Sequence, residues 1–312
     1  MKQNENVLEF TMNEEISQFL LNFFETSKLN RLPDKYGGDM IFSSPLIGVA
    51  RGDDPIFDRF KQIIGLEHLT PIELWLSEGY DTLPTSNLRV ISIVFPFDDK
   101  IRKESKNVEK LLRVTLPAEK YCIGRNYANA FKEEVCRRII EFFKFKGYRA
   151  VAAMLSKSFS LIYKEKIYST WSERHIAFAT GLGSFSLHEG LITEIGCNIR
   201  LASVVTDASL EITPRRNENP YANCLYYSKG TCRKCEARCP ANAIDENGHN
   251  KIKCQEYGKR IERKMINRIG SFLKPHQRRI NWKLRPPSFP VGCAFCQFEV
   301  PCMDKNPMAV KS

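Results

Sequence analysis

The sequence predicts a mixed α/β protein whose last third differs in character from the rest. Two observations predict this division. In the first 210 residues, apolar segments with strand and helix spacing alternate, which is typical of layered α/β architectures. Residues 211–312 hold 20 Lys and Arg against 9 Asp and Glu, which equals the whole net charge of +11, and they hold 8 of the 11 cysteines. We therefore expect domains at 1–210 and 211–312, divided near Thr213-Pro214.

Four segments of the first half predict its layers. Residues 14–29 repeat apolar side chains at i, i+3, i+4 and i+7, which indicates an amphipathic helix. Residues 89–97 (RVISIVFPF) are β-branched and aromatic, as in a buried strand. A long helix is expected over 126–146, ended by Gly147, and a strand over 148–155. This strand, helix, strand order favours a sheet covered by helices.

Two further elements complete the first half. A helix is expected over 172–180, because Gly181 and Gly183 follow it at the place where helices end. Residues 199–206 (IRLASVVT) read as another buried strand.

Length and composition exclude several classes of protein. The 312 residues, 43% hydrophobic and 27% charged, suffice for a large core and do not fit disordered, collagen-like or coiled-coil chains. No run reaches the roughly 18 apolar residues of a membrane helix. The polar start MKQNENVLEFTMNEE does not fit a secretory signal, so we expect a cytoplasmic protein without membrane contact. In a reducing compartment, clustered cysteines indicate metal ligation before disulfides.

The strongest motif is Cys232-x2-Cys235-x3-Cys239-Pro240. Ferredoxin-type sequences place cysteines of one cubane on such a tight turn, and the Cys before Pro ligates the neighbouring cluster. Eight cysteines are what two [4Fe–4S] clusters need. We expect one cluster on Cys224, Cys232, Cys235 and Cys302, and the other on Cys239, Cys254, Cys293 and Cys296.

Zinc is the competing interpretation of these cysteines. It predicts four-ligand sites built from paired C-x2-C knuckles or from Cys and His. His249 and His276 are the only histidines in this third and lie too far apart for an H-x3–5-H pair, so the spacing favours iron–sulfur clusters. Cys122, Cys136 and Cys197 are read as ordinary buried side chains.

Upstream of the cysteines, four short elements follow one another in a characteristic order. They are Glu173-Arg174, Gly181-Leu182-Gly183, Glu189-Gly190-Leu191-Ile192-Thr193 and Arg200-Leu201-Ala202-Ser203-Val204-Val205-Thr206-Asp207. Followed by C-x2-C-x3-C-P, this order resembles the cobalamin-dependent family that joins epoxyqueuosine reductases to reductive dehalogenases. The resemblance covers roughly residues 85 to 306.

The resemblance implies a fold and a set of cofactors. It implies a nitroreductase-like α/β domain that holds a base-off cobalamin, followed by a ferredoxin-like domain that feeds it electrons through two [4Fe–4S] clusters. Gly181, Gly183 and His188 are the residues expected to face the corrinoid, although a solvated loop is an open alternative for His188. Glu173 and Arg174 are expected to make an ion pair or a helix-start contact.

The chain also departs from the family pattern. Where epoxyqueuosine reductases carry an Asp proton donor, six residues before the Glu of the Glu-Arg pair, this sequence has Ile167. Dehalogenases of the family use a Tyr as the acid, so Tyr168 is the expected catalytic donor, and a strand Tyr packed on a sheet is the alternative. Leu187-His188 replaces the usual basic pair after the glycine-rich turn.

A basic segment interrupts the second cysteine group. Residues 259–287 contain ten Lys and Arg and one acid, Glu262, and a helix is expected over 257–273. Three interpretations stay open: docking of an acidic electron donor such as reduced ferredoxin or flavodoxin, a tRNA-facing patch, and a surface that offsets the charge of the clusters.

Together these observations predict an iron–sulfur oxidoreductase, cobalamin-dependent by resemblance, that reduces a small organic or modified-nucleoside substrate. The alternative is an electron-transfer or corrinoid-activating ferredoxin-like protein without a substrate of its own, which the apolar Ile167 favours.

Overall fold

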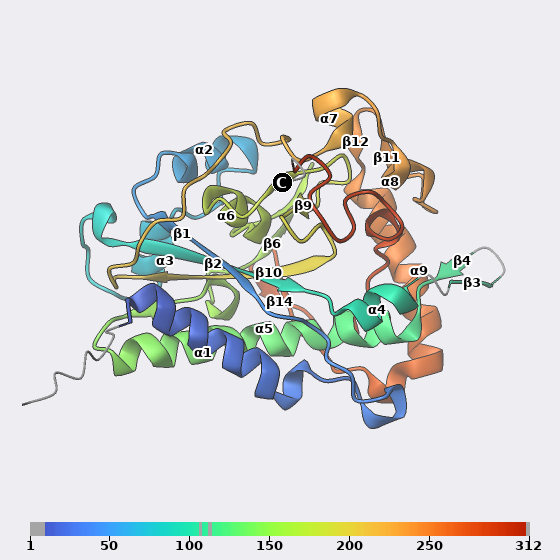
Figure 1. Cartoon of the computed structure of the whole chain (residues 1–312), viewed down its shortest axis with the longest axis horizontal. Helices are drawn as coiled ribbons and strands as arrows, with labels where there is room; N and C mark the ends of the chain where they lie inside the picture. The colour runs from blue at the N-terminus through green and yellow to red at the C-terminus, as the bar shows by residue number, and fades with distance from the viewer. Residues whose placement is uncertain (1–9, 106–107, 112–113, 310–312) are drawn as a thin grey trace, which may run out of the picture.

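The computed structural model describes residues 10–105, 108–111 and 114–309, and its centre is an antiparallel four-stranded sheet (Figure 1). The strands are β1 (Leu46–Arg51), β2 (Arg89–Pro96), β10 (Ile199–Thr206) and β5 (Ala150–Val151), in the order β1-β2-β10-β5. The pairing of β2 with β10 runs through all eight residues of each strand, from Ile199 opposite Pro96 to Thr206 opposite Arg89.

Helices cover both faces of this sheet. α1 (Met12–Thr26) and the long α5 (Glu119–Phe145) lie below it in Figure 1, and α2 (Ile56–Ile63), α3 (Pro71–Ser77) and α6 (Glu173–Ala179) pack on the opposite face. Alternate residues of β2 therefore enter different cores. Ile91, Ile93 and Phe95 join α1 and α5, whereas Val90 and Val94 join α2, α3 and α6. The continuous apolar run of this strand follows from burial on both faces.

Smaller elements surround these layers. They are α4 (Asp99–Glu104), the hairpin β3 (Glu109–Leu111) and β4 (Val114–Leu116), the hairpin β8 (Ser184–Phe185) and β9 (Leu191–Ile192), and a second sheet in the order β14-β13-β6-β7. Its strands are β6 (Leu161–Tyr163), β7 (Ile167–Ser169), β13 (Arg279–Ile280) and β14 (Lys283–Leu284). The cysteine-rich part contributes α7 (Leu225–Lys229), α8 (Lys234–Ala237), the hairpin β11 (Ile244–Asp245) and β12 (Gly248–His249), and α9 (Lys251–Ile269).

The basic helix α9 packs back onto the first half of the chain. Tyr257, Ile261, Met265 and Ile269 repeat every four residues, are buried, and belong to the same core as α1 and α5. The hydroxyl of Tyr257 accepts the backbone N–H of Thr115 in β4 at 2.8 Å. The two parts of the chain thus share a hydrophobic core, and the division at residue 210 stays a prediction.

The mixed α/β class is confirmed, while the nitroreductase-like detail stays a prediction. The predicted helix over 126–146 begins earlier, at Glu119, and the helix expected over 257–273 runs from Lys251 to Ile269, followed by a 3₁₀ turn. The strand expected over 148–155 is wrong in length. Only Ala150 and Val151 pair with the end of β10, because β5 is an edge strand and a 3₁₀ turn at Ala153–Leu155 then carries the chain away.

Within the described ranges, no helix combines the length and the apolarity that crossing a bilayer requires. Residues 1–9, which make up most of the polar start of the chain, lie outside the described residues.

Candidate functional site

Four cysteines line one small cavity in the C-terminal part of the protein. Cys224, Cys232, Cys235 and Cys302 line a cavity of about 20 Å³, together with apolar side chains and His188. The local chain brings them together: α7 starts just after Cys224 and ends at Gly230, whose φ of +66° reverses the chain toward Cys232. Burial, then the negative charges that Cys302, Cys224 and Cys232 can carry, raise the pKa of Cys235 to about 12. We call this space the thiol cavity.

The other four cysteines form a neighbouring group. Burial, and then the charges of Cys254 and Cys239, raise the pKa of Cys293 to about 12, against the backbone N–H of Phe295, which lowers it. Burial raises the pKa of Cys296. The charges of Cys293, Cys254 and Cys239, and that of Cys235 of the first group, raise it further. The eight cysteines therefore lie near one another, and their division into two ligand sets of four stays a prediction. That they ligate iron stays a prediction.

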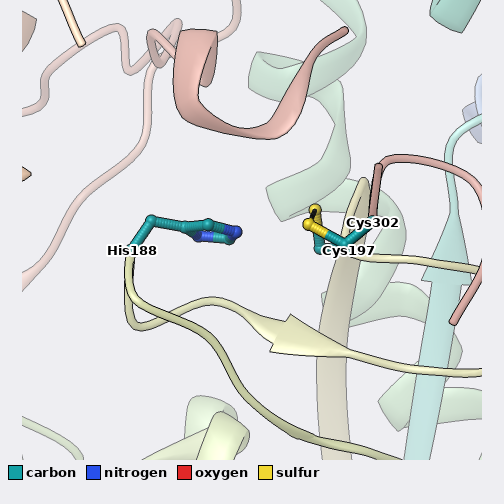
Figure 2. Close-up of side chains that lie close together, drawn as sticks. All are labelled: His188, Cys197 and Cys302. Carbon is teal, nitrogen blue, oxygen red and sulfur yellow. Dashed lines mark hydrogen bonds between the residues drawn. The ribbon is translucent and has the colours of Figure 1, made fainter. Parts of the chain in front are cut away.

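A ninth cysteine, Cys197, was expected to be an ordinary buried side chain and lies behind Cys302, next to the thiol cavity. The sulfur of Cys197 is 3.8 Å from that of Cys302, and the side chain is 1% exposed. Figure 2 shows the imidazole of His188 turned toward this sulfur pair, and the three possible ligand atoms lie within 4.8 Å of one another. No spacing motif marks Cys197, because it is far in sequence from the other cysteines.

A larger pocket of about 570 Å³ lies on the other side of the turn that carries His188. Its walls come from the end of α2, β7, α6, β8 and the turn after it, the loop before α7, α7 itself, the β11–β12 hairpin and the start of α9. They include aromatic rings (Phe60, Phe178, Phe185, Tyr221 and Tyr227) and charged side chains (Lys166, Arg174, Glu189 and Lys251). This volume is in the range of small-molecule and cofactor sites. We call it the main pocket.

Ile167 and Tyr168 both line the main pocket. The Tyr168 hydroxyl donates a hydrogen bond to the carboxylate of Glu67, which Lys164 also contacts. Burial, followed by the hydrogen bond and charge of Glu67, raises the pKa of Tyr168 to about 12. At neutral pH this hydroxyl therefore keeps its proton and shares it with Glu67, a residue for which the sequence offers no motif.

The carboxylate of Glu189 is the centre of a charge cluster at the main pocket. Its Oε2 lies 3.3 Å from Lys251 Nζ, 3.7 Å from His249 Nδ1 and 3.8 Å from Arg174 Nη1. Burial raises the pKa of Glu189, but the close contact with His249 and the charges of Lys251 and Arg174 outweigh it and lower the pKa to about 2. One acid thus faces two permanent cations and a histidine.

Glu173 and Arg174 have separate partners. Glu173 begins α6, and its buried carboxyl interacts with Ser203 and Lys132, whereas Arg174 donates a hydrogen bond to the backbone carbonyl of Glu189. Glu173 therefore has a structural role, whereas Arg174 faces the main pocket.

A single turn, residues 186–190, separates the two spaces. Ser186 and Leu187 line both of them, His188 lines the thiol cavity, and Glu189 lines the main pocket. Backbone bonds close the turn, from the N–H of Glu189 to Ser186 at 2.8 Å and from that of Ser186 to Gly190 at 3.0 Å.

The two glycines expected to face the corrinoid lie against backbone. A Cβ at Gly181, where φ is +77°, would come within 2.8 Å of the Pro214 carbonyl, and one at Gly183 would overlap the Ile192 carbonyl. Chain packing therefore explains both glycines, and their contact with a corrinoid stays a prediction, as does that of His188.

Comparison with known proteins gives structural neighbours alone. No protein-family model matches the chain, and no curated protein matches it in sequence. The epoxyqueuosine reductase of Streptococcus thermophilus aligns with 97% of this chain and 69% of its own, at 14% identity and a TM-score of 0.49. That of Bacillus subtilis aligns with 95% and 69%, at 16% identity and a TM-score of 0.45.

A reductive dehalogenase whose structure is described in terms of B12-dependent dehalogenation aligns with 78% of this chain and 33% of its own, at 15% identity and a TM-score of 0.41. Both kinds of reductase that the sequence resembles are thus among the solved structures to which this chain is similar.

Proposed function

We propose that the chain is an iron–sulfur reductase that binds two [4Fe–4S] clusters and a corrinoid. One cluster would be held by the four cysteines of the thiol cavity and the other by Cys239, Cys254, Cys293 and Cys296. The main pocket would take the corrinoid and the substrate. The observation that carries this proposal is the turn at 186–190, because it forms a wall of both spaces.

The donor set of the thiol cavity fits an iron–sulfur cluster. Four thiols line one small cavity, and all-thiolate coordination is what a cubane requires. A structural zinc ion also accepts four thiolates, so metal and sulfide analysis must distinguish the two.

The lining of the main pocket fits a corrinoid in its chemistry. Aromatic rings such as Phe185 and Tyr221 offer flat apolar surface, while Ser172, Asn247 and Arg174 offer polar groups to an amide-rimmed ring system. When bound, clusters and corrinoid would supply the low-potential electrons and the reactive metal for reduction. The chain itself would bind the substrate, shield it from water and supply a proton.

The proton source in this proposal is Tyr168. Ile167 carries no proton to give, whereas Tyr168 lines the main pocket and its hydroxyl stays protonated at neutral pH. Glu67 holds that hydroxyl in place and, with Lys164, connects it to the protein surface. Transfer of this proton to a substrate would require the Tyr168 hydroxyl to rotate from Glu67 toward the main pocket.

The exposed basic side of α9 is the proposed docking surface for an acidic electron donor, reduced ferredoxin or flavodoxin. Lys259, Arg260 and Arg263 are exposed on this helix, and Cys254 of the second cysteine group lies near its start. A charged surface next to an entry cluster raises the rate of encounter with a partner of opposite charge. A tRNA bound to the same side is the other partner that the charge allows.

The test is anaerobic reconstitution followed by iron, sulfide and corrinoid analysis. We expect about eight irons and about eight sulfides per chain, and co-elution of added cobalamin in a base-off form. Fewer than about three irons per chain would rule out the two-cluster proposal. Zinc at full occupancy without sulfide would instead show that the cysteines form a structural zinc site.

One observation favours a second function. Ile167 is apolar at the wall of the main pocket, as expected of an electron-transfer or corrinoid-activating protein without its own substrate. Turnover with a chemical reductant separates the two functions. Reduction of an epoxide-bearing nucleoside or an organohalide supports the reductase, and reduction of bound cobalamin without loss of either substrate supports the activator.

A further inference from the structure

The backbone holds Cys197 beside Cys302 independently of any side-chain contact. The N–H of Cys197 donates to the carbonyl of Cys302 at 2.8 Å, and the N–H of Asn198 donates to that of Met303 at 3.2 Å. A Cβ at the preceding residue, Gly196, would overlap the Met303 carbonyl, so a glycine is required for this approach. The Cys197 thiol then lies 3.8 Å from the Cys302 sulfur, with its S–H as the donor.

His188 approaches the same sulfur pair from the opposite side (Figure 2). Its Nδ1 accepts the backbone N–H of Gly190 at 3.2 Å, so the proton of the neutral ring is on Nε2. The side chain is 4% exposed, and Nε2 makes no hydrogen bond to nitrogen, oxygen or sulfur among the described residues, although it lies within 4.8 Å of the sulfur pair. A buried N–H without a partner costs free energy unless something accepts it, and the sulfur pair is what it faces.

We propose that Cys197 and His188 are hydrogen-bond donors to the sulfur of Cys302 and set the reduction potential of the cluster in the thiol cavity, without binding iron themselves. This inference rests on the proposed function. Cys224, Cys232, Cys235 and Cys302 already supply the four thiolates of a cubane, and it is Cys302 that lines the cavity while Cys197 lies behind it.

The direction of the effect follows from charge. A reduced cluster carries one more negative charge than an oxidised one, and part of that charge resides on the ligand sulfurs. Donors to a ligand sulfur stabilise the reduced form more than the oxidised form and therefore raise the potential. The cluster concerned lies one turn away from the main pocket, so its potential would bear on the last electron-transfer step.

The experiment compares Cys197→Ala, Cys197→Ser and His188→Phe with the unmodified protein. Cys136→Ala is the control, because Cys136 is also a buried thiol but contacts Met154 instead of the cysteine groups. Each protein is reconstituted anaerobically, its iron is counted, and its clusters are titrated electrochemically with detection by electron paramagnetic resonance.

We expect full iron content in all four variants. In Cys197→Ala and His188→Phe, the reduced-to-oxidised ratio of one cluster at a fixed potential should fall about tenfold, which is about 59 mV for a one-electron couple. Cys197→Ser keeps a donor and should recover most of this shift, and Cys136→Ala should show none.

Unchanged potentials in Cys197→Ala would overturn the inference while leaving the proposed function intact. Loss of about half of the iron in Cys197→Ala would also overturn it, because Cys197 would then be a ligand. Absence of iron from the unmodified protein would instead refute the proposed function, and this inference with it.

Discussion

The packing of α9 into the core shared with α1 and α5 makes a sharp prediction about Ile261. This side chain is fully buried, whereas Ile266, five residues further along the same helix, is 36% exposed. Ile261→Ala removes three carbons at about 0.8 kcal/mol each. The cavity left behind adds to this, so the free energy of unfolding should fall by about 3 to 4 kcal/mol. Ile266→Ala should change it by less than about 0.5 kcal/mol.

The assay is urea unfolding followed by tryptophan fluorescence. Trp75 and Trp171 are buried in the other core, between the sheet and α2, α3 and α6, while Trp282 is 52% exposed. Their emission therefore reports on the first half of the chain. If both halves unfold cooperatively, Ile261→Ala lowers the urea midpoint of this signal.

Two results would refute the reasoning. Equal losses for Ile261→Ala and Ile266→Ala would contradict the burial of α9. An unchanged fluorescence midpoint with a separate early transition in Ile261→Ala would show that the cysteine-rich part unfolds by itself, as the predicted boundary at residue 210 implies.

Three further predictions concern the site. Cys235→Ser should lose about half of the reconstituted iron, because Cys235 lines the thiol cavity. Cys136→Ser should retain the full iron content. Equal losses in the two variants would contradict the ligand assignment. Burial, and then the hydrogen bond to Glu67, raise the Tyr168 pKa from 10.0 to about 12, so this protonated hydroxyl should contribute fully to stability below pH 10 and lose its contribution as the pH rises through about 12. Difference titration of tyrosinate absorbance between the unmodified protein and Tyr168→Phe measures this, and a midpoint at or below 10 would count against the bond. Arg263→Glu should slow reduction of the clusters by an acidic donor protein, most strongly at low salt. Lys144→Glu reverses an exposed charge on α5 and should not slow it. A reduction rate that neither the charge reversal nor salt changes would exclude docking on α9.

Local patterns predict the elements that are buried on both faces. The segment 199–206 is the strand β10 to the residue, and 89–97 is β2 to within one residue, because continuous β-branched runs leave few other structures open. The edge strand β5 is shorter than the sequence predicts, because the length of its pairing depends on where β10 ends.

The site residues likewise include some that a local sequence pattern predicts and some that it does not. The C-x2-C-x3-C-P spacing marks the cysteines of α8 and its flanks, because ligands on one tight turn are neighbours in sequence. Glu67 and Cys197 carry no such mark: Tyr168 lies 101 residues from Glu67, and Cys302 lies 105 residues from Cys197.

The sequence alone therefore determines a mixed α/β protein with a basic, cysteine-rich last third, since composition, periodicity and short spacings act over a few turns of chain. Tertiary structure decides that the two cysteine groups are neighbours, that Cys197 and His188 flank Cys302, and that one turn divides the thiol cavity from the main pocket. These contacts join segments far apart in the chain, and their geometry is set by how β10, α6 and α9 pack and by no local pattern.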